Sequence, residues 1–261
     1  MIKLIATDMD GTLLRDDKSF DEEIFYIIED LYKKGITFVV ASGRQYPGLK
    51  KIFAPVLDKI IFVAENGTYV LKNDEEIFSS VMDKSVVKNI IQEIRKIPDV
   101  KPVVGCKEYT YTEDEYMYNF MSGDLFNYTM KLTKDISNID EDVLKVAIMD
   151  KGDVYNNSFN IVYPKFKDNL DVAVSGHNFI DFTNKNVNKG NAIKILQNSL
   201  GIKPEECMAF GDNYNDLRML EQVYYSFAVE NANDGIKKKA KFIAPSNNEN
   251  GVIKKIKEFC F

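Results

Sequence analysis

Short apolar runs alternate with amphipathic helical patterns at both ends of this chain, and this alternation is the feature that most restricts its fold. Near the N-terminus, strands are predicted at residues 3–7, 36–40 and 60–64, with helices at 24–31 and 49–53. Near the C-terminus, strands are predicted at 207–210, 225–229 and 242–244, and helices at 192–200, 216–222, near 235 and at 253–259. Strands that alternate with helices predict a parallel sheet covered by helices on both faces.

The middle of the chain has a different pattern. A helical pattern at residues 86–97 is followed by β-rich segments at 103–112, 143–149 and 179–183, an order typical of an α+β domain. We therefore expect an α/β protein: a Rossmann-like parallel-sheet core, residues 1–80 and 186–261, with an inserted α+β cap domain at 81–185. In the cap, the helical spacing of Met117, Phe120 and Met121 predicts core packing.

Charge and cysteine content indicate which binding partners and which cellular compartment to expect. The formal net charge is −6 and no basic stripe is present, so electrostatic binding to nucleic acid or to an anionic membrane is not expected. Three scattered cysteines argue against a disulfide framework and favour a reducing cytoplasm. The start of the sequence leaves no room for a signal peptide, and no apolar run approaches the ~18 residues of a membrane span. We expect a cytoplasmic monomer or small homo-oligomer.

Acidic and small polar residues follow three of the predicted strands, where ligands bind in open parallel sheets, and a further polar segment precedes the predicted helix at 192–200. The segments are Asp8-Met9-Asp10-Gly11-Thr12, Ser42-Gly43-Arg44, Asn188-Lys189-Gly190 and Gly211-Asp212-Asn213-Tyr214-Asn215-Asp216. Two close carboxylates repel each other unless they share a proton or a cation. Acids at separate strand ends, without cysteine or histidine, predict a hard cation that binds oxygen, and Mg²⁺ is the usual one.

The same segments offer groups that suit a phosphate. Mg²⁺ would offset the repulsion between an acidic protein and a phosphate dianion. Lys189 would supply a second positive charge, while Ser42, the backbone N–H groups near Gly43 and Asn215 would supply neutral donors. A small phosphorylated metabolite is the partner that this set predicts.

Taken together and in this order, the four segments resemble the motifs of the haloacid dehalogenase superfamily of phosphohydrolases, in particular its Cof-type members with a large C2-type cap. The resemblance covers essentially the whole chain. It implies that Asp8 is the nucleophile that forms an aspartyl phosphate, and that Asp10 protonates the leaving alkoxide and later activates water. These roles need different protonation states, so the two environments must separate the two pKa values.

The resemblance also implies the remaining site residues. Asp8, Asp212 and the backbone carbonyl of Asp10 would bind Mg²⁺, while Asp216 would steady the metal's waters or Lys189. Thr12 would support the metal site without binding the ion. The phosphoryl group would be held by Ser42, Gly43, Lys189 and Asn215.

The predicted function is Mg²⁺-dependent hydrolysis of a small phosphate monoester, with a sugar phosphate as the substrate class. A phosphomutase is one alternative, and a non-catalytic sensor of phosphorylated metabolites is another, although Asp8 and Asp10 together argue against a pure binder. His177 is predicted in a hairpin turn of the cap rather than in contact with substrate. Glu65-Asn66-Gly67-Thr68 departs from the family's usual alanine after the glycine, and no inference follows from that difference.

Overall fold

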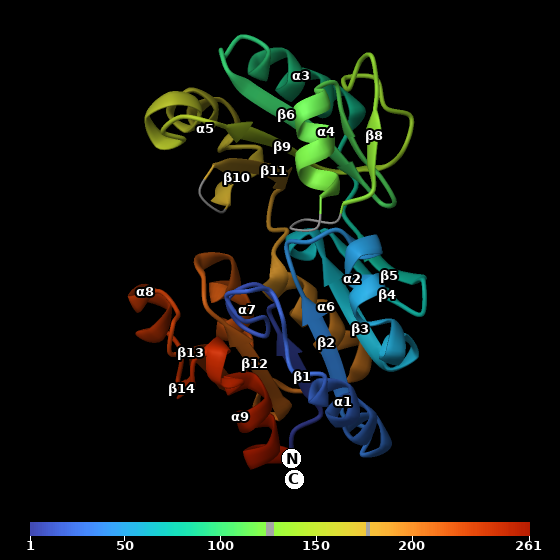
Figure 1. Cartoon of the computed structure of the whole chain (residues 1–261), viewed down its shortest axis with the longest axis vertical. Coiled ribbons are helices and arrows are strands. Elements are labelled where there is room, and N and C mark those ends of the chain that lie inside the picture. The colour runs from blue at the N-terminus through green and yellow to red at the C-terminus, as the bar shows by residue number, and fades with distance from the viewer. Residues whose placement is uncertain (124–127, 176–177) are drawn as a thin grey trace. The chain divides into compact units, whose positions relative to one another are not determined.

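The structure is a computed structural model that describes residues 1–123, 128–175 and 178–261 (Figure 1). The chain forms two compact units. The first unit comprises Met1–Gly43, Ile52–Phe78 and Asn188–Phe261, and the second comprises Arg44–Lys51 and Ser79–Val187. His177 lies outside the described residues, so its predicted hairpin stays a prediction.

An eight-stranded sheet forms the centre of the first unit. Its order is β14 (Phe242–Ala244), β13 (Tyr225–Val229), β12 (Cys207–Gly211), β1 (Leu4–Thr7), β2 (Thr37–Ala41), β3 (Ile60–Ala64), β4 (Tyr69–Lys72) and β5 (Glu75–Ser79). The strands from β14 to β3 pair in parallel, which confirms the predicted α/β core. β4 pairs antiparallel to β3, an extension of the sheet that the alternating strand and helix patterns did not predict.

The helices of the first unit follow from its sequence pattern. They are α1 (Glu23–Lys33), α6 (Lys189–Leu200), α7 (Leu217–Glu221), α8 (Asp234–Lys237) and α9 (Gly251–Cys260). α1 buries Ile24, Ile27, Ile28 and Leu31, which share one helical face. α6 begins where the Asn188 side chain accepts a hydrogen bond from Asn191 N and ends at Gly201 in the left-handed conformation.

The second unit is built on a six-stranded sheet. Its order is β10 (Leu170–Ser175), β11 (Phe179–Asn184), β9 (Val143–Asp150), β6 (Val100–Cys106), β7 (Thr110–Thr112) and β8 (Met130–Leu132). The pairs from β10 to β7 are antiparallel, and β7 and β8 are parallel. The helices are α2 (Tyr46–Ile52, with Ile52 in the first unit), α3 (Lys84–Ile94), α4 (Glu115–Ser122) and α5 (Asn160–Phe166), which follows a π-helical turn at Tyr155–Phe159.

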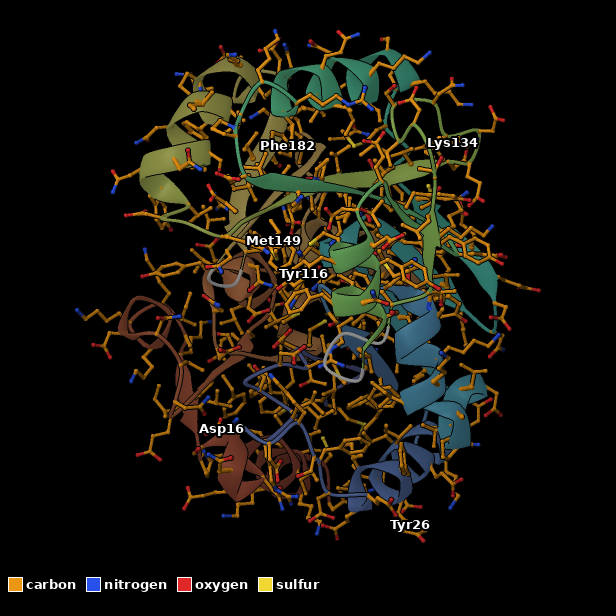
Figure 2. The ribbon with its side chains drawn as sticks, turned by 45° about the horizontal axis from the view of Figure 1, so that its top comes forward. Asp16, Tyr26, Tyr116, Lys134, Met149 and Phe182 are labelled. Carbon is orange, nitrogen blue, oxygen red and sulfur yellow. The ribbon has the colours of Figure 1, made fainter. Side chains whose placement is uncertain are left out.

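Both faces of this second sheet carry apolar side chains. One face packs against α3 and α5 in a cluster that includes Ile90, Phe166 and Phe182. The opposite face packs against α4 through Met117 and Met149 (Figure 2). The predicted core role of the methionines is confirmed, as is the α+β class of the inserted part.

The limits of the expected domains stay a prediction. The two compact units differ from these limits by residues 79–80, by residues 186–187 and by one further segment. Arg44–Lys51, expected in the core, belongs to the second unit. There the Gln45 Oε1 atom accepts a hydrogen bond from Thr129 N at 3.1 Å. Sequence periodicity reports which helix face is apolar, but it does not report which neighbour that face contacts.

Candidate active site

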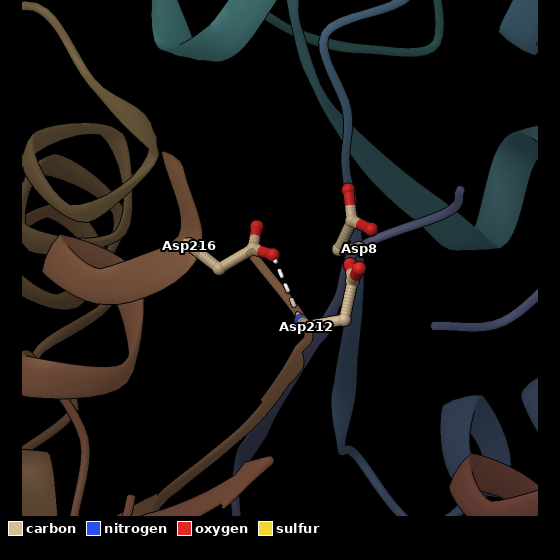
Figure 3. A group of neighbouring side chains, drawn as sticks. All are labelled: Asp8, Asp212 and Asp216. Carbon is tan, nitrogen blue, oxygen red and sulfur yellow. Dashed lines mark hydrogen bonds between the residues drawn. The ribbon is translucent and has the colours of Figure 1, made fainter. Parts of the chain in front are cut away.

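Three aspartates meet at one edge of the first sheet. Asp8 directly follows β1, Asp212 directly follows β12, and Asp216 ends the short helical turn before α7. β1 and β12 are parallel neighbours with Thr7 opposite Phe210, so the residues after both strands emerge together. One carboxylate oxygen from each aspartate lies within 4.8 Å of the others (Figure 3).

Lys189 is fully buried between two of these carboxylates. Its Nζ donates to Asp8 Oδ1 at 2.5 Å and to Asp216 Oδ1 at 2.7 Å. Because Lys189 opens α6, its charge is opposed by the positive end of the helix dipole, and the two carboxylates compensate for this repulsion. The structure thus brings Lys189 to the acidic cluster from a distant part of the chain.

Asp216 also organises the loop after β12. Its Oδ2 accepts hydrogen bonds from the backbone N–H groups of Asp212 at 3.0 Å and Asn213 at 3.1 Å. With Lys189 on its other oxygen, both oxygens of the buried Asp216 carboxylate accept hydrogen bonds from within the protein. This arrangement leaves Asp8 and Asp212 as the more available carboxylates of the cluster.

The site carries more negative charge than Lys189 alone balances. Burial raises the pKa of Asp8 well above its ordinary value, and Asp216 and Asp212 add to this although Lys189 opposes it. Burial, with Asp216 next in size, raises the pKa of Asp212 to about 6. Burial works against the charged form of Lys189, but Asp216 and Asp8 keep the Lys189 pKa above its ordinary value. A second cation among these oxygens would relieve the excess charge.

The residues fit a divalent metal ion of the hard, oxygen-binding kind. The cluster consists of carboxylates, and Thr12 Oγ1 holds the Asp212 side chain by donating to its Oδ1 at 3.0 Å. Hard divalent cations prefer such ligands. The Asp10 carboxylate is not part of the cluster, because its Oδ1 pairs with Lys18 Nζ at 3.1 Å. The metal contact expected for Asp10 involves its backbone carbonyl and stays a prediction.

The residues predicted to bind phosphate lie around the Glu65–Gly67 turn, to which the sequence analysis gave no role. Ser42 and Gly43 follow β2, and the Ser42 carbonyl accepts a hydrogen bond from Asn66 N at 2.9 Å. The Asn215 Nδ2 atom donates to Asn66 Oδ1 at 3.1 Å. Asn66 therefore touches two of the segments expected to bind phosphate.

A second asparagine missed by the sequence analysis supports the turn after β1. Asn231 Nδ2 donates to the Gly11 carbonyl at 2.7 Å, and Asn231 Oδ1 accepts from Asn247 N at 3.0 Å. Asn231 lies in a loop and Asn247 begins a short helical turn, neither with a recognisable motif, so no sequence signal pointed to them. The Glu65-Asn66-Gly67 turn did offer a sequence signal for the site, since it follows a predicted strand, as the other site segments after strands do.

Comparison with known proteins identifies the family. Residues 5–256 match the family model of haloacid dehalogenase-like hydrolases. The chain therefore belongs to that family, and the resemblance seen in its four motifs is confirmed.

Individual relatives cover nearly the whole chain. The 5-amino-6-(5-phospho-D-ribitylamino)uracil phosphatase YbjI of Escherichia coli is 31% identical over 97% of this chain and 94% of its own. YitU of Bacillus subtilis, a phosphatase with the same named substrate, is 27% identical over 98% of this chain and 97% of its own. A solved protein of Eubacterium rectale is 31% identical, with a TM-score of 0.91 over 99% of each chain.

Proposed function

We propose that this protein is a Mg²⁺-dependent phosphatase that hydrolyses a small sugar-phosphate monoester through an aspartyl phosphate. Family membership and phosphatase relatives identify the chain as a phosphoric monoester hydrolase. The ion, the substrate class and the residue roles are the proposal. The observation that carries it is the cluster of Asp8, Asp212 and Asp216 around Lys189 at the ends of β1 and β12.

Asp8 is the proposed nucleophile. Lys189 holds its Oδ1 atom, so we assign the attack to Oδ2. A bond forms between Oδ2 and phosphorus as the bond from phosphorus to the leaving oxygen breaks. Ser42, Gly43, Lys189 and Asn215 bind the other phosphoryl oxygens and keep the group in line.

Asp10 is the proposed acid and base. Its carboxyl donates a proton to the leaving oxygen, then takes a proton from the water that attacks phosphorus, releasing phosphate and restoring Asp8. Lys18 Nζ pairs with the Asp10 carboxylate across 3.1 Å. Mg²⁺ held by Asp8, Asp212 and the Asp10 carbonyl would neutralise charge on the phosphoryl group.

The first candidate substrates come from the relatives. YbjI and YitU are named for a compound whose phosphate sits on a ribityl chain. We therefore infer a phosphorylated sugar or sugar alcohol as the substrate class. A screen of phosphorylated metabolites that includes 5-amino-6-(5-phospho-D-ribitylamino)uracil should show phosphate release with Mg²⁺ and none with EDTA.

Two results of this screen would contradict the proposal: release that is unchanged in EDTA, or release from none of the sugar phosphates. A phosphomutase is separated from a hydrolase by ¹⁸O-labelled water. The hydrolase places the label in released phosphate, whereas a mutase releases little phosphate at all.

We also infer a cytoplasmic protein, acting as a monomer or small homo-oligomer. In support, the cysteines Cys106, Cys207 and Cys260 are free thiols. Within the described part of the chain, no helix combines the length and the apolar character that crossing a bilayer requires.

A further inference from the structure

The turn after β3 is the unusual feature of the first unit that the roles above leave unexplained. Glu65, Asn66 and Gly67 have φ values of 49°, 57° and 102°, so three successive residues adopt left-handed backbone conformations. Two of them carry side chains, for which this conformation is unfavourable. Such strain persists only where the surroundings fix it, and it is concentrated at functional sites.

The surroundings of this turn are the phosphate-binding segments themselves. Asn66 N donates to the Ser42 carbonyl at 2.9 Å, and Asn66 Oδ1 accepts from Asn215 Nδ2 at 3.1 Å. Gly67 packs directly on the start of α6: a Cβ there would lie 2.5 Å from the Asn188 carbonyl oxygen and 3.0 Å from Lys189 N. The turn therefore contacts three segments that are distant in sequence, all within the first unit.

These contacts fix the direction of a side chain that must meet the phosphoryl group. The side-chain amide of an asparagine can rotate about its last C–C bond unless a hydrogen bond restrains it. Once Asn66 Oδ1 holds one N–H of Asn215, the plane of that amide is set, and its remaining N–H has a defined direction. Donors aimed before the substrate arrives stabilise the developing charge without reorganisation.

We propose that Asn66 is a positioning residue of this phosphatase. Its side chain orients Asn215, and its backbone N–H holds the Ser42 loop, so that both present donors to one phosphoryl group. The inference deepens the proposed function and rests on it, because it assumes that Ser42 and Asn215 bind phosphate.

The test is a double-mutant cycle of Asn66→Gly and Asn215→Ala. Glycine keeps the left-handed backbone and the N–H to Ser42 while it removes only the amide side chain. The matched control is Asn73→Gly, because Asn73 is exposed, lies in the same unit and has a similar φ of 53°. For each variant, kcat, KM, the melting temperature and the Kd of inorganic phosphate in Mg²⁺ are measured.

We expect Asn66→Gly to weaken phosphate binding and kcat/KM by roughly tenfold, the loss of one well-placed hydrogen bond. In the Asn215→Ala background the same change should cost less than about twofold, since Asn66 acts through Asn215. The melting temperature of Asn66→Gly should equal that of the Asn73→Gly control.

Two outcomes overturn the inference while the proposed function stands. One is a hydrolysing Asn66→Gly enzyme that matches the Asn73→Gly control. The other is a full tenfold loss in the Asn215→Ala background, which would show that Asn66 acts independently. A wild-type protein that neither hydrolyses a phosphate monoester nor binds inorganic phosphate would instead remove the proposed function, and the inference with it.

Discussion

The ionisation of the Asp8 carboxyl depends on the charged residues around it. It is buried at the end of β1, one oxygen is held by Lys189, and the carboxylates of Asp212 and Asp216 lie close by. Cations favour the ionised form of a carboxylate in such surroundings, and here these are Lys189 and the proposed metal ion. An ionised Asp8 is the form that the proposed attack on phosphorus needs.

Replacing Asp8, the proposed nucleophile, tests the mechanism most directly. Asp8→Asn should reduce kcat on the order of a thousandfold or more, because an amide oxygen does not form the covalent intermediate. The far-ultraviolet circular dichroism spectrum should remain that of the wild type, since the substitution conserves shape. Asp58→Asn, at an exposed aspartate paired with Lys59, is the control and should retain full activity. Near-normal turnover of Asp8→Asn would remove Asp8 from the mechanism.

At the scale of elements, the contact between α6 and α7 depends on a residue without a side chain. Gly190 is the second residue of α6, and a Cβ there would lie 2.3 Å from the Arg218 carbonyl oxygen. Backbone atoms do not move aside as a side chain does. Gly190→Ala should therefore destabilise the protein by about 1–3 kcal/mol, although alanine favours helices over glycine.

Urea unfolding measures this effect against a matched substitution. Gly235 is likewise the second residue of its helix, α8, but a Cβ there would meet the hydroxyl of Tyr214, an exposed side chain that can rotate away. Gly235→Ala should change the free energy of unfolding by less than Gly190→Ala. Equal effects would show that helix propensity, rather than the close approach, decides both.

A buried aspartate at the end of β9 makes the second unit sensitive to acid. Burial opposes the charge of Asp150, but donors from Ser158, Gly152 and Asn157 outweigh it and lower the Asp150 pKa. Because the folded pKa is lower than the unfolded value of about 3.9, the stabilisation is present above about pH 4. It is lost as the pH falls through the folded pKa.

Asp150→Asn should therefore lower the free energy of unfolding by about 1–3 kcal/mol at pH 7, since an amide nitrogen would face buried donors. The difference from the wild type should shrink as the pH falls below 4 and the Asp150 carboxylate of the wild type takes up a proton. Urea titrations at pH 7 and pH 3 measure it, with the exposed Asp168→Asn as the control. A difference that is constant with pH would contradict the role of the charge.

Local pattern predicted the elements of the first unit well where each strand is buried on both faces. The predicted limits of β3 and β13 match the structure to the residue, because continuous apolar runs end sharply at turns. The limits of β14 match as well, although Phe242 and Ile243 are exposed. β4 escaped prediction, because its antiparallel pairing depends on a partner that sequence pattern does not name. Asp8 and Asp212 could be brought together from sequence because parallel strands end at one edge, whereas Lys189 opens a helix and was assigned to the same site by its motif. Asn66 and Asn231 could not be assigned, because their roles are hydrogen bonds between loops.

At the scale of the whole molecule, a bound divalent ion should stabilise the native state. The excess negative charge of Asp8, Asp212 and Asp216 is present only when these residues are brought together by folding. Mg²⁺ at about 100 times its Kd should add about 2.7 kcal/mol, a rise in melting temperature of roughly 5–10 °C. Thermal unfolding in Mg²⁺ and in EDTA measures it. Asp212→Asn should lose most of the rise, and an equal rise in that variant would place the ion elsewhere.

The pairing of β1 has a consequence for synthesis on the ribosome. One edge of β1 can pair with β2 soon after both are synthesised. Its other edge can pair only after β12, which begins at Cys207, has been synthesised. At about 5–20 residues per second, translating residues 42–206 takes on the order of ten to thirty seconds. During that time the nascent chain exposes the unpaired edge of β1, a known risk for aggregation. A message cut short before the codon for Cys207 would yield a chain in which Asp8 has neither Asp212 nor Asp216 beside it.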